Sequence, residues 1–196
     1  MRKAEKPYRV VYGGAFNPPT KAHLEVYRYL LERVDVGCFV YLPVSSRYRK
    51  GDLASDTHRL RMLKLATTGL EKATVSDLEL QDDAYYGTYE SLRRLDTPDQ
   101  RTAFVLGADH LRTLPRWKQA EKLLSSFTFF VLNREGKDLE ALIAADAFLY
   151  RHREAFKLFD DFKMEISSSM FRRRLDWELV PEAVAEYIKE HNLYGA

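Results

Sequence analysis

Two glycines, Gly13 and Gly14, follow a short apolar run and precede a histidine, His23. Glycine lets the backbone approach a ligand closely, and the N–H groups at the start of a helix attract anions. A histidine in the first turn of such a helix can donate a hydrogen bond to a phosphate. Residues 13–23 match neither GxGxxG nor GxxxxGK[ST], so they predict a phosphate site of another kind. Taken alone, the segment is explained equally well by a Gly-Gly turn with His23 on the surface.

A second segment, residues 166–175, has the sequence ISSSMFRRRL. Serine is a strong N-cap, and a cation in the first turn of a helix opposes the helix dipole. We expect Arg172 to lie in that first turn, which is easier to explain if an anion binds nearby. For Arg173 and Arg174 we prefer a solvated basic helix face.

Asp109 follows a third apolar run, directly after Gly107 and Ala108. A carboxylate just beyond a strand is suited to accept hydrogen bonds from the hydroxyl pair of a ribose. Trp117 could stack on an aromatic ring, although ordinary packing is the better interpretation of this residue taken alone. The other histidines are interpreted as surface or helix residues: His58, His110, His152 and His191.

The apolar pattern predicts the scaffold for these segments. Short apolar runs alternate with helical patterns, which favours the α/β class, with a Rossmann-like parallel sheet and helices on both faces. Strands are expected at residues 8–12, 38–42, 75–80, 103–106, 127–132 and 162–166. Helices are expected at residues 23–34, 55–66 and 89–95, around Arg172 and at 181–191. Ligands of such sheets bind beyond the carboxyl ends of the strands, so residues 13–23, 107–117 and 166–172 are expected in one crevice.

Composition excludes several classes of protein. With 31 Lys and Arg against 29 Asp and Glu, the 196-residue chain has a formal charge of only +2, which gives no reason to expect a nucleic-acid surface. A hydrophobic content of 45% excludes a disordered chain. No apolar run approaches the roughly 20 residues of a membrane helix, and the start lacks the apolar stretch of a signal peptide. A single cysteine, Cys38, excludes an internal disulfide and a Cys-based zinc cage. We therefore expect a cytoplasmic protein.

Two of these segments carry a resemblance to a known family. Residues 13–23 resemble the GxFxPxHxGH or TxxH signature of nucleotidyltransferases that condense ATP with a phosphate-bearing partner, and residues 166–172 resemble the ISSTxxR element of that superfamily. Within it, residues 8–194 most resemble the nicotinate/nicotinamide mononucleotide adenylyltransferases. Supporting stretches are Leu42-Pro43 with a basic loop to Lys50, residues 76–80 leading to Gly87-Thr88, Gly107-Ala108-Asp109 with Trp117, and residues 187–194.

Four positions depart from the usual bacterial pattern. Thr20 stands where most bacterial members have His, Ala22 where they have Gly, and Asn17 where they have Asp. Gly87 replaces the usual Tyr before Thr88. Threonine can still hydrogen-bond a phosphate oxygen but carries no charge. We expect adenylyl transfer to survive these changes, while the choice of pyridine nucleotide is left open.

The resemblance implies an enzyme of NAD biosynthesis that joins ATP and nicotinate mononucleotide, or also nicotinamide mononucleotide, into a dinucleotide with release of pyrophosphate. It implies that His23, Arg172 and Thr20 are the catalytic residues. The implied ATP-binding residues are Gly13, Gly14, Ala15, Phe16, His23, Gly107, Ile166, Ser167, Ser168 and Arg172. The implied mononucleotide-binding residues are Lys50, Thr88, Asp109 and Trp117. Arg47 and Arg49 are alternative candidates for the phosphate contact of Lys50. Mg²⁺ is expected on the ATP phosphates, with no metal ligand from protein side chains.

The resemblance also implies an organisation and leaves alternatives. Residues 1–196 are expected to form a single nucleotidyltransferase domain, in which residues 167–196 are a C-terminal helical part that completes the ATP site. The expected partners are ATP and a pyridine mononucleotide, with no nucleic acid and no membrane, and a homo-oligomer is left open. The alternatives are another nucleotidyltransferase, such as a phosphopantetheine adenylyltransferase, and a non-catalytic nucleotide-binding regulator. The choice between nicotinate and nicotinamide stays open, because backbone N–H groups alone can select a carboxylate.

Overall fold

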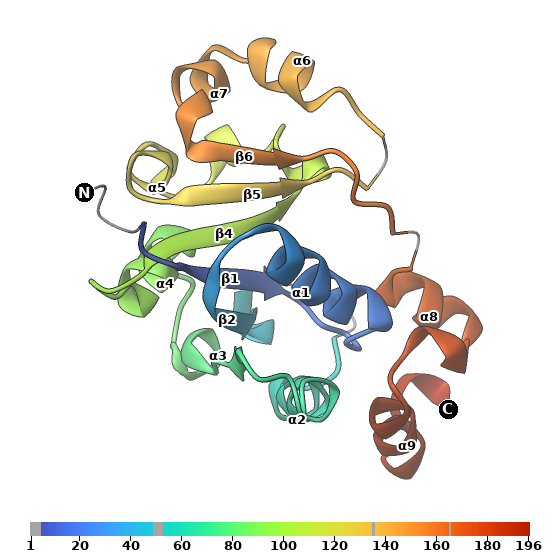
Figure 1. The fold of residues 1–196 in the computed structure, drawn as a ribbon. Coiled ribbons are helices and arrows are strands. Elements are labelled where there is room, and N and C mark those ends of the chain that lie inside the picture. The colour runs from blue at the N-terminus through green and yellow to red at the C-terminus, as the bar shows by residue number, and fades with distance from the viewer. Residues whose placement is uncertain (1–4, 49–52, 135, 165) are drawn as a thin grey trace. The chain divides into compact units, whose positions relative to one another are not determined.

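The computed structural model describes residues 5–48, 53–134, 136–164 and 166–196. Within these ranges lies a six-stranded sheet in the order β3-β2-β1-β4-β5-β6 (Figure 1). The pairs β1–β4, β2–β3, β4–β5 and β5–β6 are parallel. The strands are β1 (Tyr8–Gly14), β2 (Val36–Pro43), β3 (Ala73–Val75), β4 (Arg101–Gly107), β5 (Thr128–Leu132) and β6 (Phe156–Phe159). The predicted α/β class with a parallel sheet is confirmed.

Helices connect these strands. They are α1 (Lys21–Arg33), α2 (Asp56–Ala66), α3 (Leu78–Gln81), α4 (Thr88–Leu95), α5 (Ala120–Ser126), α6 (Leu139–Ala144), α7 (Ala147–Arg151), α8 (Ser168–Arg174) and α9 (Glu182–Glu190). In the described part of the chain, none of them is both long and apolar enough to span a membrane.

The chain divides into two compact units. Unit 1 comprises Met1–Tyr12, Asp35–Cys38 and Tyr86–Met164, and unit 2 comprises Gly13–Val34, Phe39–Tyr85 and Glu165–Ala196. In unit 1, residues 8–11 of β1 pair with β4, β4 pairs with β5, and β5 pairs with β6. Val10, Phe129 and Phe130 are fully buried, because parallel strands are covered on both faces and are therefore apolar along their length.

The core of unit 2 is formed by helical apolar faces and by the buried residues of β2. In α1, Leu24, Tyr27 and Leu30 are buried at roughly helical spacing. The first part of α2 is linked to α9 by a contact of 2.9 Å between His58 Nδ1 and the Tyr187 hydroxyl. This arrangement joins α2, which lies in the first half of the sequence, to α9, which lies near its end.

The prediction of a strand at residues 75–80 is wrong, because β3 ends at Val75 and α3 begins at Leu78. The Ser76 hydroxyl accepts a hydrogen bond from the Leu78 N–H at 3.3 Å. Asp77 precedes the helix as its N-cap residue, and its carbonyl accepts from the Leu80 N–H. Such local bonds compete with strand pairing, so an alternating apolar pattern becomes a turn and a short helix.

The prediction of a sixth strand at residues 162–166 is also wrong. The sixth strand is β6. Its residue Phe159 pairs with Leu132 of β5, and the Phe159 ring packs edge-on against Phe130. Phe162 is buried but lies outside any strand. Residues 156–159 and 162–166 both contain apolar residues, and the first of these segments is the one that pairs with β5.

Candidate active site

The turn after β1 begins with a close approach between backbone and ring. The Phe16 ring lies against Gly14, where an added Cβ would stand 3.3 Å from the ring. Phe16 has a positive φ of 46° and is 1% exposed, and its ring also contacts the ring of His23. The ring is therefore a packing element, and a contact of Phe16 with ATP would fall to its backbone. Gly13 and Ala15 flank this turn and are half-buried.

Thr20 and His23 form a capping box at the start of α1. The Thr20 backbone N–H donates to His23 Nδ1 at 2.8 Å, and the Thr20 hydroxyl lies 2.9 Å from the same nitrogen. Because Nδ1 accepts a hydrogen bond, the proton of the neutral ring resides on Nε2. The cap thus orients the imidazole and makes Nε2 the donor that a phosphate oxygen would require.

Arg172 reaches the same turn from the other end of the sequence. Its Nη1 donates to the Asn17 carbonyl at 2.5 Å, and the Ser168 hydroxyl donates to the Pro18 carbonyl at 2.8 Å. Ser167 is the N-cap of α8, and the half-buried Ile166 precedes it. The two motif segments of unit 2 are therefore brought together.

The expected place of Arg172 in the first turn of its helix is wrong. The helix α8 runs from Ser168 to Arg174, and Arg172 lies in its last turn. A cation is favoured there by the helix dipole, so its position needs no anion to explain it. Support for a function comes instead from its bond to the Asn17 carbonyl.

Three contacts of the turn were not predicted from the sequence. The buried Asn17 side-chain oxygen accepts from the Tyr194 hydroxyl at 2.7 Å and from the Ala54 N–H at 3.0 Å. Burial raises the pKa of Tyr194 above its ordinary value, so this hydroxyl stays a neutral donor. The carbonyl of Ala15 accepts from the buried Arg59 at 2.6 Å. The only sequence signal for Arg59 was its position three residues after Asp56 in a predicted helix.

The basic loop after β2 is described only in part. Lys50 and its competitor Arg49 lie outside the described residues. Arg47 is exposed, and its Nη1 donates to the Asp82 carbonyl at 2.6 Å. The prediction of a phosphate contact from this loop stays a prediction.

The remaining predicted residues belong to unit 1. Asp109 lies in a short 3-10 turn (Ala108–His110) directly after β4, and its side chain is 58% exposed. A Cβ on Gly107 would collide with the Asp109 carboxylate, so glycine leaves room for this acid. Trp117 packs edge-on against Phe104 and His110.

Thr88 lies close to the segment that contains Trp117, because its neighbour Gly87 packs against Lys118. Gly87 has a φ of 99° and caps α4, and a Cβ there would meet the Lys118 side chain at 3.1 Å. The segments that carry Thr88 and Trp117 therefore pack against each other within unit 1. The expectation that all the predicted segments share one crevice stays a prediction.

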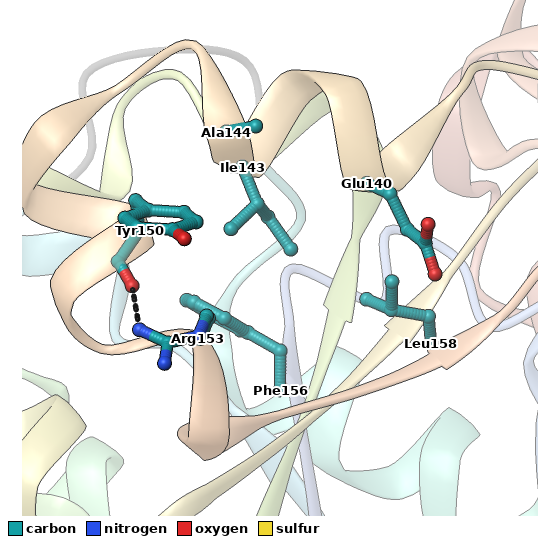
Figure 2. A pocket seen from close by; sticks show the side chains of 7 residues that line it. All are labelled: Glu140, Ile143, Ala144, Tyr150, Arg153, Phe156 and Leu158. Carbon is teal, nitrogen blue, oxygen red and sulfur yellow. Dashed lines mark hydrogen bonds between the residues drawn. The ribbon is translucent and has the colours of Figure 1, made fainter.

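A separate cavity of about 350 Å³ lies in unit 1 beside β6. Figure 2 shows Ile143 and Glu140 of α6 above Phe156 and Leu158 of β6, with Tyr150 and Arg153 at one side. Arg153 Nη1 donates to the Tyr150 carbonyl at 3.2 Å. The described residues that line this cavity include none of those predicted for the active site, so the motif chemistry lies elsewhere.

Comparisons with known proteins agree with these motifs. Residues 11–174 match the family described as cytidylyltransferase-like. A relative from Acholeplasma laidlawii named "Probable nicotinate-nucleotide adenylyltransferase" is 32% identical over 188 residues, covering 94% of this chain and 96% of the relative. A relative of the same name from Dehalococcoides mccartyi is 30% identical over 194 residues, covering 94% and 95%.

A solved structure of Plasmodium falciparum nicotinic acid mononucleotide adenylyltransferase complexed with NaAD superposes with a TM-score of 0.78. It is 23% identical, and the match covers 96% of this chain and 98% of that chain. At this identity the likeness shows the fold. By family match and by relatives at 30% identity or more, the chain belongs to the cytidylyltransferase-like family and, within it, to the nicotinate-nucleotide adenylyltransferases.

Proposed function

We propose that this chain joins ATP to nicotinate mononucleotide, giving the deamido dinucleotide and pyrophosphate in NAD biosynthesis. The observation that carries the proposal is the convergence of His23, Arg172 and Ser168 on one turn after β1. The names of the relatives supply the substrate class. Nicotinamide mononucleotide is the second acceptor to be tested.

The reaction is a displacement at the α-phosphorus of ATP. A phosphate oxygen of the mononucleotide forms the new P–O bond, and the bond from the α-phosphorus to the oxygen bridging to the β-phosphate breaks. Pyrophosphate leaves with that electron pair. The attacking phosphate is already an anion at neutral pH, so no general base and no covalent enzyme intermediate are needed. Catalysis then consists of positioning and charge stabilisation.

In this proposal the residues of unit 2 bind the triphosphate. His23 donates from Nε2 to a phosphate oxygen, and Arg172 supplies positive charge. Thr20 is fully buried and acts by holding His23 through the capping box. Backbone groups frame the nucleotide, at Gly13, Gly14, Ala15, Phe16, Ile166, Ser167 and Ser168. Residues 167–196 then complete the ATP side of a single nucleotidyltransferase domain.

The residues of unit 1 would bind the mononucleotide. Asp109 accepts from ribose hydroxyls, and Trp117 and Thr88 lie beside the pyridine ring. The exposure of Asp109 and the packing of Gly87 against Lys118 support this assignment. We assign Gly107 to the ATP side and keep Lys50 as a candidate phosphate contact.

Mg²⁺ is proposed as the divalent ion of the reaction. Within the described residues, no group of three or more His, Cys, Asp or Glu side chains is arranged to hold a metal ion. Mg²⁺ is commonly bound through substrate phosphates and water, so we propose that ATP carries the ion. When bound, it neutralises charge on the triphosphate.

The test is pyrophosphate release from ATP and Mg²⁺ with nicotinate mononucleotide, nicotinamide mononucleotide or phosphopantetheine. We expect product with nicotinate mononucleotide and none with phosphopantetheine. His23→Ala should lower kcat by about 100- to 1,000-fold, the typical cost of removing one preorganised donor. His191→Ala, a histidine at the end of α9, is the matched control and should keep full kcat.

Two outcomes would overturn the proposal. Release with phosphopantetheine alone would reassign the acceptor. ATP binding in calorimetry without turnover of either pyridine mononucleotide would favour a non-catalytic regulator.

A further inference from the structure

Arg59 of α2 is a buried cation with a complete set of partners. Its side chain is 0% exposed, and its Nε donates to the Ala54 carbonyl at 3.1 Å. Nη1 donates to the Ala15 carbonyl and Nη2 to the Val44 carbonyl, both at 2.6 Å. Nη2 also contacts the Asp56 carboxylate at 2.5 Å. All three guanidinium nitrogens are therefore engaged.

A buried ion pair is an expensive way to fill space. Removing a guanidinium from water is costly, and apolar residues of similar volume often stabilise a protein equally well or better. An apolar side chain, however, cannot bond to carbonyl oxygens. The feature that distinguishes arginine at position 59 is a planar fork that holds several acceptors in fixed directions.

The three carbonyls belong to three separate segments of unit 2. Ala15 lies in the turn that leads to His23, Val44 directly follows β2, and Ala54 precedes the N-cap of α2. The first two segments are also joined directly, because the Val44 N–H donates to the Gly14 carbonyl at 3.0 Å. One side chain thus ties the phosphate turn to the start of the basic loop.

Asp56 strengthens the hold on the segment that follows β2. Its carboxylate accepts from the Ser46 N–H at 2.9 Å and from the Ser45 hydroxyl at 3.2 Å. Partial burial acts to raise the pKa of Asp56, but the hydrogen bonds from Ser46 and Arg59 outweigh it and lower the pKa. The carboxylate therefore stays charged and keeps its hold on residues 45–46 and on Arg59.

We infer that Arg59, with Asp56, is a positioning pair for the ATP side of the reaction: it sets the turn at residues 15–20 against the segment at residues 44–47. The inference rests on the proposed function for its kinetic consequences. The structural consequences of the inference do not depend on the proposed function, because the hydrogen bonds exist without substrate. Arg59 touches no substrate group in this assignment and acts only through the backbone it holds.

The experiment compares Arg59→Lys with Arg61→Lys. Arg61 is exposed on the same helix, so the two variants make the same chemical change with and without the buried partners. Lysine keeps the charge but has no fork, and it cannot bond three separate carbonyls at once. Asp56→Asn is the third variant, which keeps the acceptor oxygen and loses the charge. Each is assayed below its own unfolding temperature, with full helical circular dichroism.

We expect Arg59→Lys to lower kcat/KM for ATP by roughly 10- to 100-fold, because small misplacement of a phosphate-binding group has effects of this size. The KM for the mononucleotide should change by less than about twofold, and Arg61→Lys should match the parent. Asp56→Asn should shift the same parameters in the same direction by a smaller factor. Hydrogen exchange without substrate should rise at the amides of residues 13–20 and 44–47 in Arg59→Lys.

The outcomes separate the two proposals. A parent that turns over neither pyridine mononucleotide overturns the function, and the exchange experiment then decides the inference alone. A folded Arg59→Lys with parental kinetics and parental exchange at both segments overturns the inference while the function stands. A lower unfolding temperature with unchanged kinetics in the folded variant also overturns it, since Arg59 would then serve only stability.

Discussion

The turn after β1 and the segment after β4 are constructed in contrasting ways. In unit 2 the turn is held by many directed bonds: Arg59 to Ala15, Arg172 to Asn17, and Ser168 to Pro18. In unit 1 the segment after β4 presents an Asp109 side chain that is 58% exposed, on a single 3-10 turn. In the first segment hydrogen bonds fix the backbone, whereas the second segment exposes side chains on a short turn.

This difference matches the two tasks proposed for the segments. Transfer of an adenylyl group depends on in-line geometry, so the groups that hold phosphates gain from a fixed backbone. An aromatic ring that stacks on a pyridine offers a broad face and tolerates small displacements. We infer that changes in the first segment act on kcat and on ATP, whereas changes in the second act on mononucleotide affinity.

After His23→Ala, the largest effect in this comparison is expected for Arg172→Ala. The guanidinium bonds to the Asn17 carbonyl, so the variant loses both a cation near the phosphates and an anchor of the turn. We expect kcat/KM for ATP to fall by about 10- to 100-fold. This loss is smaller than that for a group that donates only to substrate, because part of the hydrogen bonding of Arg172 holds the turn. Steady-state pyrophosphate release measures this.

Arg173→Ala is the control for that prediction. Arg173 is exposed and lies in the same last turn of α8. The substitution Arg173→Ala therefore removes the same charge from the same helix. We expect it to stay within about twofold of the parent, as surface substitutions usually do. Equal losses in both variants would mean that long-range charge matters and the contact with Asn17 does not.

A smaller and more selective effect is expected for Trp117→Ala. Stacking of a base on an aromatic side chain contributes about 1–3 kcal/mol, so the KM for the mononucleotide should rise about tenfold. The KM for ATP should change by less than about twofold, and Trp117→Phe should recover most of the loss because it keeps an aromatic face. Parallel rises in both KM values would show that Trp117 supports the fold of its segment instead.

The anchored turn was also the harder part to predict. His23 and Arg172 could be selected because each motif is continuous in the sequence. The partners of Arg59 could not, because Ala15 lies 44 positions away and Val44 lies 15 positions away. An Asp56–Arg59 pair on one helix is visible in the sequence, but the same spacing describes any exposed surface pair. Only the packed structure reveals that the arginine is buried.

The fold followed from the sequence wherever apolar runs were unambiguous. The runs at β1, β2, β4 and β5 each became a strand. Four helices of the described residues were not predicted: α3, α5, α6 and α7. Of these, α6 and α7 carry a visible start signal, because the side chains of Asp138 and Asp146 cap them. At residues 75–80 the apolar alternation was outweighed by Ser76 and Asp77, whose hydrogen bonds favour a turn.

The smallest effect is expected for Tyr194→Phe, which removes a single anchor of the turn. Asn17 keeps its bond from the Ala54 N–H, so no acceptor is left bare and the loss should be about 1 kcal/mol of unfolding free energy. Because other bonds still hold the turn, kcat should stay within about threefold of the parent. Denaturant unfolding of parent and variant, with the exposed Tyr150→Phe as control, measures the difference.

The pH dependence of that difference tests its origin. Burial raises the pKa of Tyr194 in the folded protein above the value of about 10 expected when unfolded. A group with a raised folded pKa contributes its stability fully below the unfolded value and loses it as the pH rises through the folded one. The difference between parent and Tyr194→Phe should therefore be constant from pH 7 to about pH 9 and shrink above about pH 10. A difference that grew above that pH would mean that the hydroxyl is not a buried neutral donor, and that the turn is less firmly anchored than its hydrogen bonds indicate.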